Sequence, residues 1–214
     1  MLTIEEQRAI QAIVTSRDIP HLVHFTHVNN LSSILQHGFY PQSRKNELAH
    51  GIAQINDQLR FDNKLEYSCF SITFPNSKMF YRVRNKIGGD WAVLLINKKI
   101  LWEKECLFYP TNAANNSVRF NNVNDHKGHK ALNDIFNSSD ESPRDVFLSA
   151  CDPTDEQAEV MISGIIESSY IDAIIFDNQL VANHYYGLIK NKEVFYCRPA
   201  TKIYTTRKAF RYGH

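Results

Sequence analysis

Apolar residues near the start of the chain recur at helical spacing. Ile10, Ile13 and Val14 fall on one face of a helix, so that face can pack against a core. Thr3 followed three residues later by Glu6 is a capping-box pattern, in which side chains satisfy the first backbone N–H groups of a helix. We therefore expect a helix that begins just after Thr3.

A strand and a second, shorter helix are expected next. The run HLVHF at residues 21–25 combines aliphatic and aromatic side chains, which is typical of strands. NNLSSILQHG has helical spacing and ends in Gly38, the residue type that most often closes a helix. Residues 43–60 have helical composition in part, and a further helix is expected there.

The rest of the chain consists of short apolar runs separated by turn-forming residues. The runs are SCFSITF (68–74), WAVLLI (91–96), DVFLSA (145–150), AEVMI (158–162), DAIIF (172–176) and EVFYC (193–197). Each is rich in β-branched or aromatic residues and is predicted to form a strand. Helices early and strands late, without regular βαβ alternation, indicate an α+β fold with a mixed or antiparallel sheet. The asparagine-rich segment 109–130 is expected to be a long loop, and loops of that length are often functional.

Composition narrows the class of protein. The chain has 214 residues and no proline- or glycine-rich linker, which predicts a single domain over residues 1–214. A net charge of +1 means that any nucleic-acid partner must be held by a local basic face. The first residues lack a signal-peptide pattern and no apolar run approaches the ~20 residues of a membrane span, so we expect a cytoplasmic protein, by default a monomer. The four cysteines form no C-x-x-C pair, and motifs for P-loops, dinucleotide folds, serine hydrolases and zinc proteases are absent, so no metal site is expected.

The stretch DPTDEQAEVMI at 152–162 places a carboxylate at the start of an apolar run. If the stretch is a strand, alternation puts Gln157 and Glu159 on one face, about 7 Å apart. A carboxylate and an amide placed in this way can orient a sugar hydroxyl, offset a developing positive charge and accept a proton. From the residues alone, a solvent-facing position on an edge strand is the commoner explanation of Glu159.

Histidines occur in two short groups. His24 and Thr26 of HFTH share one face of the expected strand, which suits a polar ligand such as a ribose. A hydrogen-bonded core histidine is the commoner role for such a position. HKGH at 126–129 has no further ligand at metal-binding spacing and predicts a solvated loop.

A basic run, NSKMFYRVRNK, mixes Lys78, Arg82 and Arg84 with aromatic side chains. This composition can hold phosphates while an aromatic ring stacks on a base. A simple solvated face is the more frequent explanation of such a charge run.

Three of these stretches together resemble the DarT family, bacterial toxins that ADP-ribosylate DNA bases. HFTHVNNLSSILQHG, ITFPNSKMFYRVR and TDEQAEVMI occur in the family's order. The resemblance implies an ADP-ribosyltransferase fold, in which a split, strongly bent β-core binds NAD as co-substrate without a metal. It also implies that a central strand supplies the catalytic glutamate.

The resemblance assigns roles to particular residues. Glu159 and Arg60 are implied to be catalytic, with Arg60 also holding the NAD phosphates. The residues implied to contact NAD are His24, Thr26, Asn30, Leu31, Gly38, Arg60, Met79 and Tyr81. For the reaction that this implies, we expect Gln157 to position the acceptor base, and the basic run and the asparagine-rich loop are our candidates for binding the DNA strand.

The resemblance also implies a substrate and a partner. Base pairing hides the attacking edge of a base, so single-stranded DNA is the expected substrate. DPTDEQAEV and FPNSKMFY favour guanine over thymine as the modified base, and a macrodomain antitoxin of the DarG type is the expected partner. Transfer to RNA or to a protein, and a non-catalytic module that binds NAD or nucleic acid, stay open. A nuclease toxin is disfavoured because no acidic cluster suits magnesium.

Overall fold

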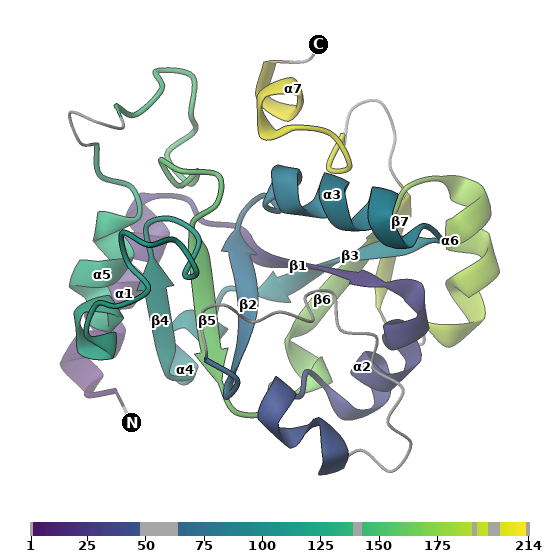
Figure 1. Cartoon of the computed structure of the whole chain (residues 1–214), viewed down its shortest axis with the longest axis horizontal. Helices are drawn as coiled ribbons and strands as arrows, with labels where there is room; N and C mark the ends of the chain where they lie inside the picture. Colours follow the sequence, from purple (N-terminus) through teal and green to yellow (C-terminus); the bar gives the residue numbers. More distant parts are fainter. Residues whose placement is uncertain (1, 48–63, 139–142, 190–191, 197–201, 213–214) are drawn as a thin grey trace.

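The computed structural model places seven strands in one sheet of order β4-β5-β2-β1-β3-β6-β7 (Figure 1). The residues it describes are 2–47, 64–138, 143–189, 192–196 and 202–212. The strands are β1 (His21–His27), β2 (Tyr67–Ile72), β3 (Trp91–Asn97), β4 (Cys106–Tyr109), β5 (Glu159–Ser163), β6 (Ile171–Phe176) and β7 (Glu193–Tyr196). Neighbours are antiparallel except β6 and β7, which are parallel, so the predicted α+β class with a mixed sheet is confirmed.

Short helices surround the sheet. The α-helices are α1 (Ile4–Ser16), α2 (Leu31–His37), α3 (Ser77–Ile87), α4 (Ile100–Glu103), α5 (Gly128–Asp134), α6 (Gln179–Tyr185) and α7 (Arg207–Tyr212). The 3-10 turns are η1 (Val28–Asn30), η2 (Gln42–Glu47), η3 (Val123–His126), η4 (Ser168–Tyr170) and η5 (Tyr186–Leu188). The predicted cap of α1 is present, since the Glu6 N–H donates to Thr3 Oγ1 at 3.2 Å. None of the helices described here is long and apolar enough to cross a bilayer.

The sheet splits between β1 and β2. β1 pairs with β3 along its whole length but with β2 at only two positions, Leu22↔Ile72 and Val23↔Ser71. Beyond those pairs the two strands separate, and in Figure 1 the strands β4, β5 and β2 run in a clearly different direction from β1 and β3. This is the split, bent core that the family resemblance implied.

Apolar side chains pack on both faces of the sheet. The main cluster buries Leu22, Leu94 and Val160 together with residues of α1, α2, α4 and α5. On the other face, α3 covers β1 and β3 through a separate cluster that contains Phe80. A third cluster gathers Met161 with residues of β4 and the loop after it. Fully burying one such large apolar side chain contributes about 1.5–3 kcal/mol, so the sheet is fixed from both sides.

Some sequence predictions were wrong. DVFLSA forms turns rather than a strand, and its Val146 and Phe147 are 89% and 63% exposed. β-propensity describes fit to a half-buried surface, and this segment has no neighbouring strand to pair with. The asparagine-rich segment is not a loop throughout, since it is irregular only as far as η3 and α5. The basic run, for which no element was predicted, forms α3. Of the helix expected at 43–60, the first residues form η2, and residues 48–63 lie outside the described part of the chain.

Gly38 ends α2 in a conformation that other residues rarely adopt. Its φ is +87°, and a Cβ built on it would lie 2.1 Å from the carbonyl oxygen of Ile166. We expect Gly38→Ala to lower the free energy of unfolding by about 2–4 kcal/mol, because left-handed strain and a backbone clash add together. Urea unfolding measures this. Gly187→Ala is the control, since its added Cβ meets nothing within 4 Å, and equal midpoints for the two variants would contradict the expectation.

Candidate active site at the split of the sheet

Glu159 is the first residue of β5, a strand that lies between β4 and β2. It pairs with Tyr109 of β4 and is half-buried. Its carboxylate is held at both oxygens: Asn112 Nδ2 donates to Oε1 at 3.0 Å, and the Ala113 N–H donates to Oε2 at 2.9 Å. A solvent-facing edge position is therefore excluded, and the carboxylate has a fixed orientation.

The loop after β4 supplies both of these donors. Asn112 Oδ1 accepts from the Ala114 N–H at 2.9 Å, so the amide must turn its NH₂ group towards Glu159. Sequence reasoning assigned this loop to DNA binding and missed its contact with the glutamate. The available signal was an asparagine close behind a strand, since Asn readily hydrogen-bonds to nearby backbone.

His24 lies on β1 just past the last β1–β2 pair. Its Nδ1 donates to the carbonyl oxygen of Cys69 on β2 at 2.9 Å, so a side chain bridges the two strands where the backbone ladder stops. The half-buried ring also packs edge-on against Phe39 and contacts Phe70, with centroid distances of 5.0 and 5.3 Å. His24 thus lies where the two halves of the sheet separate.

The core contains three more of the residues implied to contact NAD, namely Thr26, Asn30 and Leu31. Thr26 Oγ1 accepts from Asn30 Nδ2 at 3.0 Å, and both residues are buried. Leu31 is fully buried in the main cluster, and Gly38 packs on the backbone of Ile166. The structure therefore gives these four residues contacts that hold β1, η1 and α2 in place.

His24 and Glu159 project from opposite faces of the paired strands. His24 is paired with Leu94 of β3, which belongs to the main cluster, so the His24 side chain lies on the face of that cluster. Val160 also belongs to the main cluster, so the preceding residue, Glu159, lies on the other face. Side chains of successive strand residues point to opposite faces. A ligand that contacts both residues must therefore reach both faces of the sheet, at the point where β1 and β2 separate.

The turn before β5, residues 151–158, carries Gln157. The Gln157 N–H donates to Asp155 Oδ1 at 2.9 Å, as in an Asx turn, and the strand begins only at Glu159. The prediction that Gln157 and Glu159 alternate on one strand face is therefore wrong. Arg60, the other implied catalytic residue, lies outside the described residues.

The basic run forms α3, and its side chains differ in their exposure to solvent and in their contacts. Lys78 and Arg82 are exposed, and Tyr81 is 71% exposed, all three on the outer side of the helix. Met79 is half-buried against the cluster beneath α3. Arg84 is engaged within the protein, because its guanidinium lies over the ring of Tyr204 and donates to that residue's carbonyl oxygen at 3.3 Å.

The two histidines of HKGH are not solvated as predicted. His126 is buried with its ring stacked on Tyr109 at 3.9 Å, and burial lowers its pKa. His129 donates from Nδ1 to the carboxylate of Glu6 at 2.9 Å and so joins α5 to α1. Both contacts are long-range, so local spacing could not predict them.

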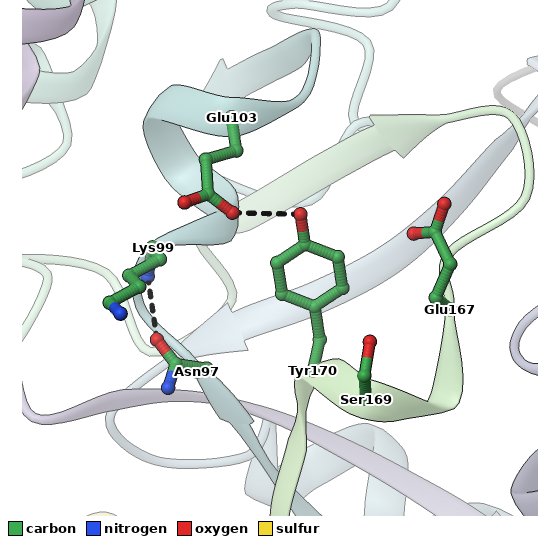
Figure 2. A pocket seen from close by; sticks show the side chains of 6 residues that line it. All are labelled: Asn97, Lys99, Glu103, Glu167, Ser169 and Tyr170. Carbon is green, nitrogen blue, oxygen red and sulfur yellow. Dashed lines mark hydrogen bonds between the residues drawn. The ribbon is translucent and has the colours of Figure 1, made fainter.

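A separate hollow of about 370 Å³ lies beyond the end of β3 (Figure 2). Its lining residues are Asn97, Lys99, Glu103, Glu167, Ser169 and Tyr170. Burial, and then the hydrogen bond to Glu103 at 2.8 Å, raise the pKa of Tyr170 to about 12. None of the predicted site residues that the structure describes lines this hollow. Over the described ranges, no group of three His, Cys, Asp or Glu residues could hold a metal ion.

Comparison with known proteins shows which family this chain matches. A family model described as "ssDNA thymidine ADP-ribosyltransferase, DarT" matches residues 23–204. No curated protein matches the chain in sequence.

Solved structures share the fold at low sequence identity. Thermus sp. 2.9 DarT in complex with NAD+ is 14% identical with a TM-score of 0.55, over 84% of this chain and 96% of that one. The same protein in complex with ADP-ribosylated ssDNA gives 14% identity and a TM-score of 0.59, over 84% and 95%. Thermosipho africanus DarTG in complex with ADP-ribose gives 16% identity and a TM-score of 0.61 over 86% of this chain, which spans 50% of that protein.

Proposed function

The chain belongs to the DarT family of single-stranded DNA ADP-ribosyltransferases, and from that premise we propose that it transfers ADP-ribose from NAD to a base in single-stranded DNA. One observation of this chain carries the proposal. A half-buried carboxylate, Glu159, is held at both oxygens near the point where the sheet splits. A fixed negative charge in such a place stabilises a cation that forms next to it.

In the proposed reaction, a ring nitrogen of the base displaces nicotinamide from NAD. The bond from C1′ of the nicotinamide ribose to nicotinamide breaks, and a bond from C1′ to the base nitrogen forms. The ribose is oxocarbenium-like between these events, and the base nitrogen loses its proton. Glu159 hydrogen-bonds a ribose hydroxyl, offsets the positive charge and receives that proton. His24, at the split between β1 and β2, contacts NAD, and Arg60 holds the pyrophosphate.

The acceptor strand is proposed to lie along the turn before β5 and the outer side of α3. Gln157 on the turn positions the base, while Lys78 and Arg82 on α3 contact phosphates. Exposed Tyr81 on the same side offers a ring on which a base can stack. Arg84 ranks below these residues, because its guanidinium is engaged by Tyr204 and Asp177. Lys78 also pairs with Glu156, at 3.5 Å, but its side chain is largely exposed.

Two bases are candidates for modification. The family description names thymidine, whereas the motifs DPTDEQAEV and FPNSKMFY favour guanine. Oligonucleotides that contain thymine but no guanine, or the reverse, separate the two. The decisive measurement is intact mass after incubation with NAD, in which one adduct adds one ADP-ribose. If RNA or the protein itself gains ADP-ribose and DNA does not, the DNA assignment is wrong.

A macrodomain protein of the DarG type is the proposed partner, as an antitoxin that removes ADP-ribose from the base. The name DarTG of the Thermosipho africanus structure supports this pairing. We propose that the chain acts in the cytoplasm, where it meets single-stranded DNA and NAD, and as a monomer.

The role of α3 in strand binding gives a testable prediction. The double variant Lys78→Gln/Arg82→Gln should bind a single-stranded oligonucleotide more weakly. The slope of log affinity against log salt should fall by about 1.4, because each lost phosphate contact contributes about 0.7. Fluorescence anisotropy at several salt concentrations measures this. As a control, Arg8→Gln/Lys99→Gln removes two exposed positive charges outside α3. An unchanged slope in the α3 variant would show that the DNA strand does not bind to α3.

A further inference from the structure

We propose that the C-terminal helix α7 is a positioning element for the acceptor side of the site. It acts on the turn before β5 (residues 151–158) through Arg207 and Arg211. This role rests on the proposed function, because that turn carries Gln157 and leads directly into Glu159.

The segment that ends in α7 is docked on the sheet. The Tyr204 O–H lies 2.6 Å from the carbonyl oxygen of Trp91 on β3 and 3.0 Å from that of Ile175 on β6. Ile203 is buried in the cluster beneath α3, and Phe210 packs against Phe74 with a centroid distance of 5.0 Å. α7 therefore has a fixed position from which its arginines can act (Figure 1).

Both arginines of α7 donate to the turn. Arg207, which is buried, donates to the carbonyl oxygens of Pro153 at 2.6 Å and Thr154 at 3.2 Å. Arg211 makes a two-point contact with the carboxylate of Asp152, at 2.7 and 2.5 Å, and Asp152 is fully buried. A planar guanidinium fixes both the distance and the direction of its partner, so these contacts set the path of the backbone.

Other elements hold the remaining parts of the turn. Arg144 donates to the carbonyl oxygen of Asp152 at 2.7 Å, and Thr73 Oγ1 donates to that of Cys151 at 3.0 Å. Ser77, at the start of α3, donates to Glu156 at 3.3 Å. Lys78 on α3 also pairs with Glu156 at 3.5 Å. α7 adds the contacts at Pro153 and Thr154 and a second contact at Asp152.

The contacts of α7 are separate from those of the catalytic carboxylate. Asn112 and the Ala113 N–H, which hold Glu159, belong to the loop after β4 and make none of the contacts described for α7. We expect loosening of α7 to displace Gln157 together with the turn, while Glu159 keeps its hydrogen bonds to Asn112 and Ala113. This separation distinguishes a positioning role from general support of the fold.

The test uses Arg207→Gln, with transfer kinetics measured against both substrates, a single-stranded oligonucleotide and NAD. We expect the KM for the oligonucleotide to rise about tenfold and the KM for NAD to change less than about twofold. Arg8→Gln, an exposed arginine on α1, is the matched control and should leave both values unchanged. Arg211→Lys is the second variant. It keeps a positive charge beside buried Asp152, so the fold is retained, but it loses the two-point contact and should show the same pattern more weakly.

Three results would overturn this role for α7. They are wild-type kinetics in Arg207→Gln and Arg211→Lys, equal changes in both KM values, and a fall in kcat with neither KM changed. If wild-type protein transfers no ADP-ribose to DNA, the proposed function itself fails and the role of α7 falls with it. Transfer by wild-type protein without the KM split would overturn only the role of α7.

Discussion

Replacing Glu159 with Gln is expected to lower the rate of ADP-ribose transfer by about 100- to 1,000-fold, because a neutral amide cannot offset the oxocarbenium charge. The amide also cannot accept the proton that the base loses. The measurement is the rate of adduct formation on a single-stranded oligonucleotide at saturating NAD. Binding of NAD should change far less than the rate, since charge develops only as the bond to nicotinamide breaks.

Controls separate the loss of charge from loss of the fold. Gln is isosteric with Glu and keeps one acceptor for the loop after β4, so the thermal unfolding midpoint should shift by only a few degrees. Glu167→Gln removes a carboxylate that pairs with Lys104 beside the distant hollow, and it should leave the rate unchanged. Near-wild-type transfer by the Glu159 variant would show that another group carries the chemistry.

Much of the sheet was predictable because strand periodicity is local. Three of the predicted strands, WAVLLI, AEVMI and DAIIF, correspond to β3, β5 and β6. Their apolar side chains fit a buried pleated surface, and this can be read from each run alone. DVFLSA has the same composition but forms a turn whose long-range partner is Tyr212, which donates from its O–H to Asp145 and packs against the ring of Phe147. Composition alone cannot distinguish a strand that finds a neighbour from one that does not.

The candidate site was predictable in part, for a related reason. The family motifs indicated His24 and Glu159, and the structure places both beside the split of the sheet, although on opposite faces. Asn112 and the arginines of α7 were missed, because they act through hydrogen bonds across 46 or more residues of chain. Such contacts follow from the tertiary fold and leave no periodic trace in the sequence.

Asn112→Asp is expected to lower the rate of ADP-ribose transfer at neutral pH by about 100-fold, although Asp and Asn have nearly the same shape. The new carboxylate can still accept from the Ala114 N–H, so the loop keeps its conformation. Its other oxygen replaces the NH₂ group that lies 3.0 Å from Glu159 Oε1. Two carboxylates at that distance repel each other, so Glu159 either turns away or retains a proton, and both outcomes remove the charge that the oxocarbenium ion needs.

The pH dependence of Asn112→Asp identifies the cause. Two carboxyl groups that share a site titrate as a pair, and repulsion raises the pKa of one of them. As pH falls through that raised pKa, the protonated group donates to the other and restores the hydrogen bond to Glu159. The rate relative to wild type should therefore rise between pH 8 and about pH 5.5. Asn115→Asp adds the same charge to an exposed position of the same loop and should show neither the loss nor the recovery. A pH-independent deficit in Asn112→Asp would mean that Asn112 supports the loop alone, and a full rate would mean that the backbone N–H of Ala113 is enough to hold the carboxylate.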